Sequence, residues 1–117
     1  MYAAKISDHA SERIVFGDEY GRRTKLATDN VREILNNPNR HVVLGSRDRG
    51  EKTFILFYDS INDSFAIALQ NQNESGKGKV ITVLSLRCYN GPFPITDNLL
   101  EQAKLRSMIG YSLYKFK

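Results

Sequence analysis

The sequence contains few of the residues that several common kinds of site require. Its 117 residues include one cysteine, two histidines and no tryptophan. A single cysteine, Cys88, can build neither a disulfide within the chain nor a cysteine-rich zinc site, so a reducing cytoplasm is the expected compartment. No apolar run approaches the roughly 20 residues that cross a bilayer, and the start lacks a signal-peptide pattern. We therefore expect a cytoplasmic protein that contacts no membrane.

Motifs for nucleotide binding and for covalent hydrolysis are also missing. Neither G-x-x-x-x-G-K-[ST] nor G-x-G-x-x-G occurs, and no G-x-S-x-G is present. The two histidines, His9 and His41, belong to no H-E-x-x-H pattern, and Cys88 has no basic partner at a recognisable spacing. These absences predict a protein without a metal or other cofactor, and they argue against a serine or cysteine nucleophile.

What the sequence does have is an excess of positive charge. Lysine and arginine total 17 against 13 acidic residues, which gives a net charge of +4 and a pI near 9.3. This balance favours polyanionic partners, RNA among them. The length suits one compact domain, and no internal repeat or linker divides it. We predict a single domain over residues 1–117, with a C-terminal helical extension at about 95–117.

Hydrophobic periodicity predicts two helices near the start. Apolar residues at i, i+4 and i+8 predict a helix over about 8–15, with Ser7 or Asp8 as its cap. A second helix is predicted after a cap at Thr28 or Asp29, and the "NNPN" sequence that follows ends it. The positions that the two helices are expected to bury are Ile6, Ala10, Ile14, Val31, Ile34 and Leu35.

After the second helix the periodicity becomes extended. Four runs rich in β-branched and aromatic residues, "HVVLGS", "KTFILFYDS", "SFAIALQNQ" and "KVITVLSLRCY", are separated by short polar connections. Such connections join antiparallel neighbours, so we predict a four-stranded meander. Strict alternation in the last run would place on one face Val80, Thr82, Leu84, Leu86 and Cys88, and on the other Ile81, Val83, Ser85, Arg87 and Tyr89.

The sequence "NGPFPIT" breaks the sheet, and a helix is predicted after a cap at Thr96 or Asp97. The residues available for burial on this helix are Leu99, Leu100, Ala103 and Met108. The tail "YSLYKFK" either forms a fifth short strand or docks as an extension. The fold class is therefore α+β: two N-terminal helices, a four-stranded antiparallel sheet and a C-terminal helix, with the helices on one face or at one end of the sheet.

His9 and Arg13 are the first candidates for chemistry. Residues at i and i+4 of a helix share a face, so both side chains could reach one substrate. A histidine carries protons near neutral pH, and an arginine offers a planar fork of donors that fits a phosphate. The alternative is that His9 is hydrogen-bonded to a neighbouring loop and Arg13 is merely solvated.

A second group of basic residues surrounds one predicted turn between strands. The stretch "GSRDRGEK" contains three basic residues within a span of six positions: Arg47, Arg49 and Lys52. They either contact RNA phosphates at the end of the sheet or serve solubility alone.

A third group lies in the last strand. Ser85, Arg87 and Tyr89 are two residues apart, and Tyr58 at the end of an earlier strand could stand beside them. An arginine buried without a partner would be costly. Either an anionic ligand therefore meets Arg87, or the arginine pairs with an acidic residue such as Asp59.

The stretch "ISDHASERI" resembles the opening motif I-[ST]-x-H-A-x-x-R of small bacterial and phage proteins in the RelE-like endoribonuclease superfamily, the BrnT- and RegB-like group. The order helix, helix, four strands is also similar, so the likeness covers roughly residues 6–89. This chain departs from the family in its longer connection "FGDEYGRRTKLAT", in which Arg22 or Arg23 would stand for a second family arginine.

The resemblance implies a RelE-like, microbial-RNase-like fold and metal-independent cleavage of RNA by attack of the ribose 2′-OH on the adjacent phosphate. It implies His9 as general base or acid and Arg13 and Arg87 as phosphate stabilisers, with Lys52 and Tyr58 in support. The residues expected to bind RNA are Arg22, Arg23, Arg47, Arg49 and Ser85.

The expected function is that of an endoribonuclease acting as the toxin of a toxin and antitoxin pair or as a phage nuclease for mRNA, which includes mRNA on the ribosome. Its expected partners are RNA and an antitoxin protein. The alternative is a non-catalytic module that binds RNA or protein, such as a phage-encoded inhibitor of a host protein.

Overall fold

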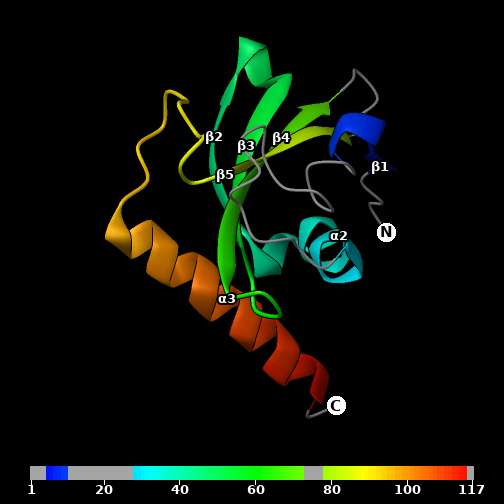
Figure 1. The fold of residues 1–117 in the computed structure, drawn as a ribbon, viewed down its shortest axis with the longest axis vertical. Coiled ribbons are helices and arrows are strands. Elements are labelled where there is room, and N and C mark those ends of the chain that lie inside the picture. Colours follow the sequence, from blue (N-terminus) through cyan, green and yellow to red (C-terminus); the bar gives the residue numbers. More distant parts are fainter. Residues whose placement is uncertain (1–4, 11–27, 73–77, 116–117) are drawn as a thin grey trace.

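The computed structural model describes residues 5–10, 28–72 and 78–115, and its centre is a twisted sheet with helices on both sides (Figure 1). Residues 8–10 are helical and open the first predicted helix. The other elements are β1 (Lys5–Ile6), α2 (Thr28–Asn36), η1 (Pro38–Arg40), β2 (Val42–Arg47), η2 (Asp48–Gly50), β3 (Lys52–Asp59), β4 (Ser64–Gln72), β5 (Gly78–Ser85) and α3 (Asp97–Lys115).

The predicted four-stranded meander is confirmed. Strands β2 to β5 pair antiparallel with their neighbours along the chain. A fifth strand, β1, adds to β5 in parallel and gives the order β1-β5-β4-β3-β2. The sequence analysis missed β1 because two residues are too few to show a period.

Local capping explains where the helices begin. The Ser7 hydroxyl accepts a hydrogen bond from the Ala10 amide (3.1 Å), as predicted for a cap of the first helix. The Thr96 hydroxyl accepts one from the Leu99 amide (3.2 Å), which confirms the predicted start of α3. The predicted buried stripe of α2 is also confirmed, because its three residues are at most 4% exposed: Val31, Ile34 and Leu35.

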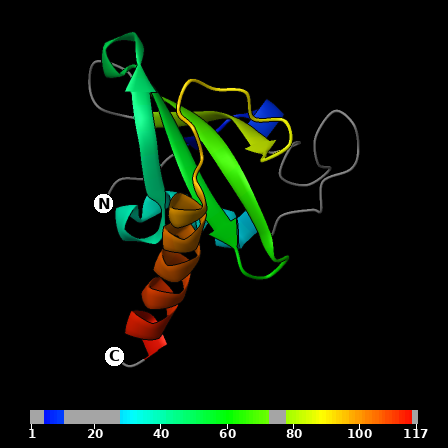
Figure 2. The ribbon, with the colours of Figure 1, turned by 90° about the vertical axis from the view of Figure 1, so that its left-hand side faces the viewer.

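The two faces of the sheet have separate cores. The first, which we call the α2 face, packs against α2 and Ala10, and its sheet residues are Ile55, Phe57, Ala66, Ala68, Val80 and Val83. The second, which we call the α3 face, packs against α3 and the segment before it. The buried residues of this core are Val42, Phe54, Leu56, Ile67 and Ala103. Figures 1 and 2 show α2 and α3 on opposite sides of the strands. The alternative that the helices share one face of the sheet is therefore wrong, because both faces of β3 and β4 are apolar.

A β-bulge changes the alternation of β5. Leu69 pairs with Thr82 and Gln70 pairs with Val80, so Ile81 is an extra residue in β5. Val80 and Val83 therefore both face α2, although they are three residues apart. The strict alternation predicted for this strand holds from Thr82 to Ser85 and is wrong before it.

The C-terminal helix is less buried than predicted. Leu99 and Leu100 pack on the α3 face, and Ala103 is fully buried. Met108, expected in the core, is 53% exposed, and Ser107 is buried instead. Helix α3 continues to Lys115, so the tail is not a fifth strand, and its end extends past the sheet (Figure 2). In the described part of the chain no helix has the length and apolar character needed to span a membrane.

Candidate nucleic-acid interface

A line of polar and basic residues crosses the sheet at the end where β2 joins β3. Arg47 pairs with Lys52, Lys52 with Asn71, and Asn71 with Lys79. Lys79 pairs in turn with Lys5 of β1. Residues paired directly across strands point to the same face. Lys52 lies two positions before Phe54 of the α3 core, so Lys52 and the residues of β2, β4 and β5 in this line lie on the α3 face. We call Arg47, Lys52, Asn71 and Lys79 the basic row.

The basic row is open to solvent. All four of its residues are exposed. Lys52 has one partner, Asp48, at 3.5 Å between Nζ and Oδ2, and such exposed pairs contribute about 1 kcal/mol or less. Among the described residues no ion pair involves Arg47 or Lys79. Neighbouring strands are about 4.8 Å apart, so the row extends for roughly 15 Å from β2 to β5. A line of cations of this length suits an extended polyanion.

The turn at the end of the row presents one more cation. Asp48 and Arg49 adopt left-handed backbone conformations, with φ of 53° and 58°. They reverse the chain between β2 and β3 and leave Arg49 exposed beside Arg47. The structure thus brings together the three basic residues predicted from this turn: Arg47, Arg49 and Lys52.

Sequence analysis did not find Lys79 or Asn71. Lys79 is far from the turn in sequence, and its face depends on the bulge at Ile81. The signal that was available is the "KGK" sequence at the start of the fourth predicted strand, which places a lysine at the same end of an antiparallel meander as Lys52.

His9 lies at the β1 edge of the sheet. The Ser7 amide donates to the Val80 carbonyl (2.9 Å), so the chain leaves β1 beside β5 and then turns into helical residues 8–10. Ala10 is buried against the α2 face, whereas His9 is exposed. Because four residues separate it from Lys5, the Cα atoms of the two lie within about 15 Å. The other predicted residues near it lie outside the described residues: Arg13, Arg22 and Arg23.

Tyr58 is at the opposite end of β3 from Lys52. Six residues of extended strand separate the two by about 20 Å, so one phosphate cannot contact both. The Tyr58 hydroxyl donates a hydrogen bond to the Asp63 carboxylate. This bond, with smaller contributions from burial and from the charges of Asp63 and Asp59, raises the pKa of Tyr58 to about 12. The Lys104 ammonium lies 5.3 Å from the centre of its ring. Tyr58 therefore remains a hydrogen-bond donor within the fold.

Ser85 and Arg87 do not form a common group with Tyr58. Strand β5 ends at Ser85, so the predicted continuation of this strand to Tyr89 is wrong. Ser85 is buried on the α2 face opposite Ala66, and its hydroxyl accepts a hydrogen bond from the Cys88 amide (3.2 Å). Arg87 is exposed in the turn that follows. Neither Asp59 nor another described acidic residue forms an ion pair with Arg87.

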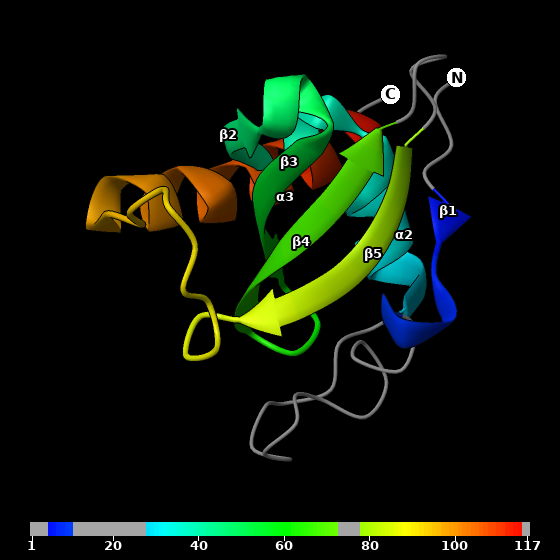
Figure 3. The ribbon, with the colours of Figure 1, turned by 90° about the horizontal axis from the view of Figure 1, so that it is seen from above.

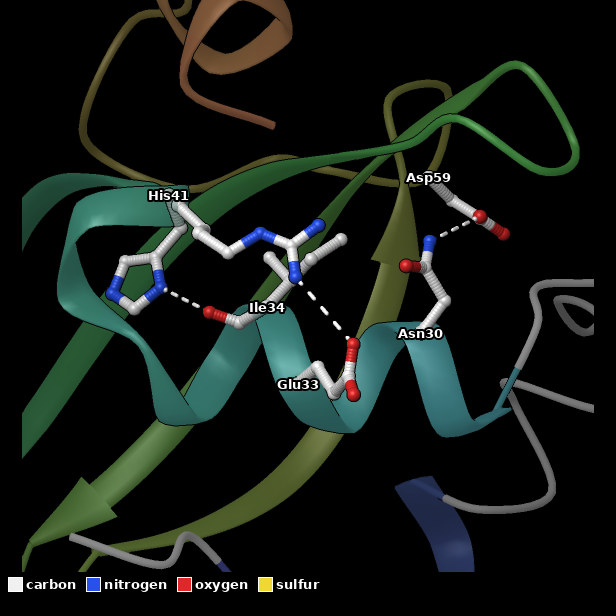
Figure 4. A network of polar contacts seen from close by, with 6 residues as sticks. Asn30, Glu33, Ile34, His41 and Asp59 are labelled. Carbon is white, nitrogen blue, oxygen red and sulfur yellow. Dashed lines mark hydrogen bonds and ion pairs between the residues drawn. The ribbon is translucent and has the colours of Figure 1, made fainter. Parts of the chain in front are cut away.

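Buried polar residues gather at the end of the sheet away from the basic row (Figure 4). Asp59 is fully buried, and its carboxylate accepts hydrogen bonds from the Asn30 amide (2.8 Å), the Ile61 backbone (3.1 Å) and the Asn62 amide (3.0 Å). Asn30 belongs to α2, so this carboxylate ties the helix to the β3 to β4 turn. The contacts satisfy a buried charge and have a structural role.

His41 forms a second buried contact at this end. Its Nδ1 donates to the Ile34 carbonyl (2.8 Å) at the end of α2, and its own carbonyl accepts from Arg106 of α3 (3.2 Å). Burial lowers the pKa of His41; the hydrogen bond to Ile34 opposes this, and the charge of Arg106 lowers the pKa further. His41 therefore joins the helices of the two faces as a neutral imidazole.

No protein-family model, curated protein or solved structure matches this chain. The resemblance to RelE-like endoribonucleases therefore stays a prediction from one motif and the element order. In the described ranges, no three potential metal ligands come together.

Proposed function

We propose that this protein binds RNA through its basic row. The observation that carries the proposal is the register of the sheet, which places Arg47, Lys52 and Lys79 side by side on one face with the amide of Asn71 between them. Their long side chains extend from a rigid sheet, so the cations are held in a line without a loop having to order on binding. Stacked nucleotides advance about 3.4 Å along one strand, so roughly four of them match the length of the row.

The test is the salt dependence of binding. Fluorescence anisotropy with a labelled RNA oligonucleotide should give an affinity that falls steeply with salt, because phosphate contacts release counterions. The double variant Lys52→Gln/Lys79→Gln should bind more weakly and reduce the slope of log K against log[salt] by about 1.4, or 0.7 for each lost contact with a single strand. Arg32→Gln/Lys104→Gln, at exposed positions of the two helices away from the row, removes the same charge and should retain the slope. Equal losses in both variants would contradict the assignment to the row.

Metal-independent cleavage of the bound RNA is a second candidate, and the exposure of His9 at the β1 edge of the sheet favours it. In this reaction His9 accepts the proton of a ribose 2′-OH, the oxygen attacks the adjacent phosphorus, and the 5′-oxygen leaves with a proton from an acid. Nearby cations stabilise the charge on the phosphorane. The same cations form the surface that an antitoxin would have to cover.

Cleavage is tested with purified protein and RNA in EDTA. The expected products are a 2′,3′-cyclic phosphate and a 5′-hydroxyl, and a 2′-deoxy substitution at the cleaved position should abolish the reaction. His9→Ala should remove cleavage while RNA affinity changes by less than about threefold. If the protein bound RNA but the RNA stayed intact at all times, cleavage would be contradicted and only the binding function would remain.

A further inference from the structure

Beside the basic row, the α3 face has an apolar surface that α3, the described helix on this face, does not pack against. The next pair on this face of β4 and β5, two positions along β4 from Asn71, is Leu69 and Thr82. Both are half-buried. Helix α3 packs against β3 and β2, and Figure 3 shows it displaced from β4 and β5 on this side. Partly exposed apolar sheet surface is thus left next to a line of cations.

The segment before α3 adds aromatic rings to this surface. The ring of Phe93 lies over Gly45, where an added Cβ would come within 2.4 Å of its Cε1 atom. Phe93 also contacts Phe54 edge to face, with 5.6 Å between ring centres. The Tyr89 hydroxyl donates to the Phe93 carbonyl (2.7 Å) and accepts from the Phe93 amide (3.2 Å), which fixes the segment. Phe93 and Tyr89 remain half-buried. We call Leu69, Thr82, Tyr89 and Phe93 the apolar shelf.

The distance between row and shelf fits a nucleotide. Two residues of strand separate Asn71 from Leu69, which is about 7 Å. A chain whose phosphates lie on the row could therefore lay its bases on the shelf. Unpaired bases have apolar faces that stack on aromatic and aliphatic side chains, whereas a duplex keeps its bases stacked inside.

We propose that the ligand is single-stranded RNA, bound with its phosphates on the basic row and its bases on the apolar shelf. This inference rests on the proposed RNA-binding function and names the class of RNA. The charge of the row selects a polyanion, and the shelf beside it selects one with exposed apolar groups along its backbone. An acidic peptide fits the row but has nothing for the shelf.

The deciding experiment compares three labelled ligands with the unmodified protein: a single-stranded RNA 10-mer, an abasic chain with the same number of phosphates, and a 10-base-pair RNA duplex. Anisotropy should give an affinity for the 10-mer at least about tenfold higher than for the abasic chain, and also higher than for the duplex. Equal affinities for the 10-mer and the abasic chain, or tighter binding of the duplex, would overturn the proposal while the proposed function stood. Failure of all three to bind would instead overturn the proposed function.

A variant then locates the base contacts. Leu69→Ser should weaken binding of the 10-mer about threefold to tenfold and leave binding of the abasic chain unchanged. Val43→Ser is the matched control, because Val43 is 55% exposed and pairs with Ile55 of the α2 face. Circular dichroism shows whether each variant is folded. If Leu69→Ser does not fold, the comparison of the three ligands with the unmodified protein still tests the proposal. A ten-glutamate peptide that bound as tightly as the RNA 10-mer would overturn the choice of RNA.

Discussion

The two ends of the sheet use polar residues in opposite ways. At the end of β3 that follows Tyr58, a fully buried carboxylate and a buried imidazole contact α2, and the carbonyl of His41 contacts α3. At the end that begins with Lys52, the residues of the basic row are exposed, and the described part of the chain offers them a single acidic partner, Asp48. Buried polar groups need partners to offset their desolvation, so the first set holds the fold together. The second set is exposed, so we expect it to contribute little to stability.

The largest effect on stability should come from Asp59. Replacing it with asparagine turns one acceptor oxygen into a donor that faces other donors, so Asp59→Asn should lower the free energy of unfolding by about 3 kcal/mol. Urea denaturation measures this. Asp48→Asn is the matched control, since asparagine tolerates the left-handed backbone there and only an exposed ion pair is lost; its expected effect is about 0.5 kcal/mol. Similar losses in both would remove the contrast between the two ends.

The second-largest effect on stability is expected where the apolar shelf meets the sheet. Gly45→Ala places a methyl group against the Phe93 ring, so the ring must move and the unfolding free energy should fall by about 2 kcal/mol. Thermal unfolding and RNA affinity should be measured on the same sample. The affinity for the single-stranded 10-mer should fall more than that for the abasic chain. A variant with full stability and unchanged base preference would show that Phe93 is not held as described.

A smaller effect should follow from pH. Burial lowers the pKa of His41 in the native state, so below about 6.5 the unfolded chain binds a proton that the folded chain resists. Stability is therefore fully present above that pH and is lost as the pH falls, with a slope of at most about 1.4 kcal/mol per unit from this group. Urea midpoints between pH 7.5 and 5 measure it. His41→Asn should reduce the dependence of the unfolding free energy on pH. His9→Gln, at an exposed position, should leave this dependence in place.

The smallest effect sharpens the comparison. Lys52→Gln/Lys79→Gln should change the unfolding free energy by no more than about 0.5 kcal/mol, because exposed charges contribute little to stability. The same variant is expected to show a clear loss of RNA affinity. A loss of more than 2 kcal/mol in unfolding free energy would mean that the basic row stabilises the fold, as Asp59 does.

Much of the fold was predictable because its signals are local. The α2 stripe of Val31, Ile34 and Leu35, the caps at Ser7 and Thr96, and the four antiparallel strands each follow from residues close in sequence. The distribution of helices over two faces was not predictable in this way. It depends on which apolar face of the strands each helix covers, and both faces read alike in the sequence.

The candidate site was predictable only in part, for a related reason. Arg47, Arg49 and Lys52 are neighbours in sequence, and the turn that joins them is short. Asn71 and Lys79 enter the row only through strand register, which composition and periodicity do not give. The family resemblance implies one site for Tyr58 and Lys52, but the length of β3 separates them.

The bulge in β5 decides where one of the row's charges points. Eight residues of β5, Gly78 to Ser85, lie opposite the seven of β4 from Ala66 to Gln72. The extra residue reverses the phase of the strand, so that Val80 turns into the core and Lys79 turns outward to the row. A deletion of Ile81 would exchange these roles, burying an ammonium group and exposing a valine. One inserted residue thus links core packing to the proposed RNA-binding surface, and insertions or deletions there should be far less tolerated than the substitutions described above.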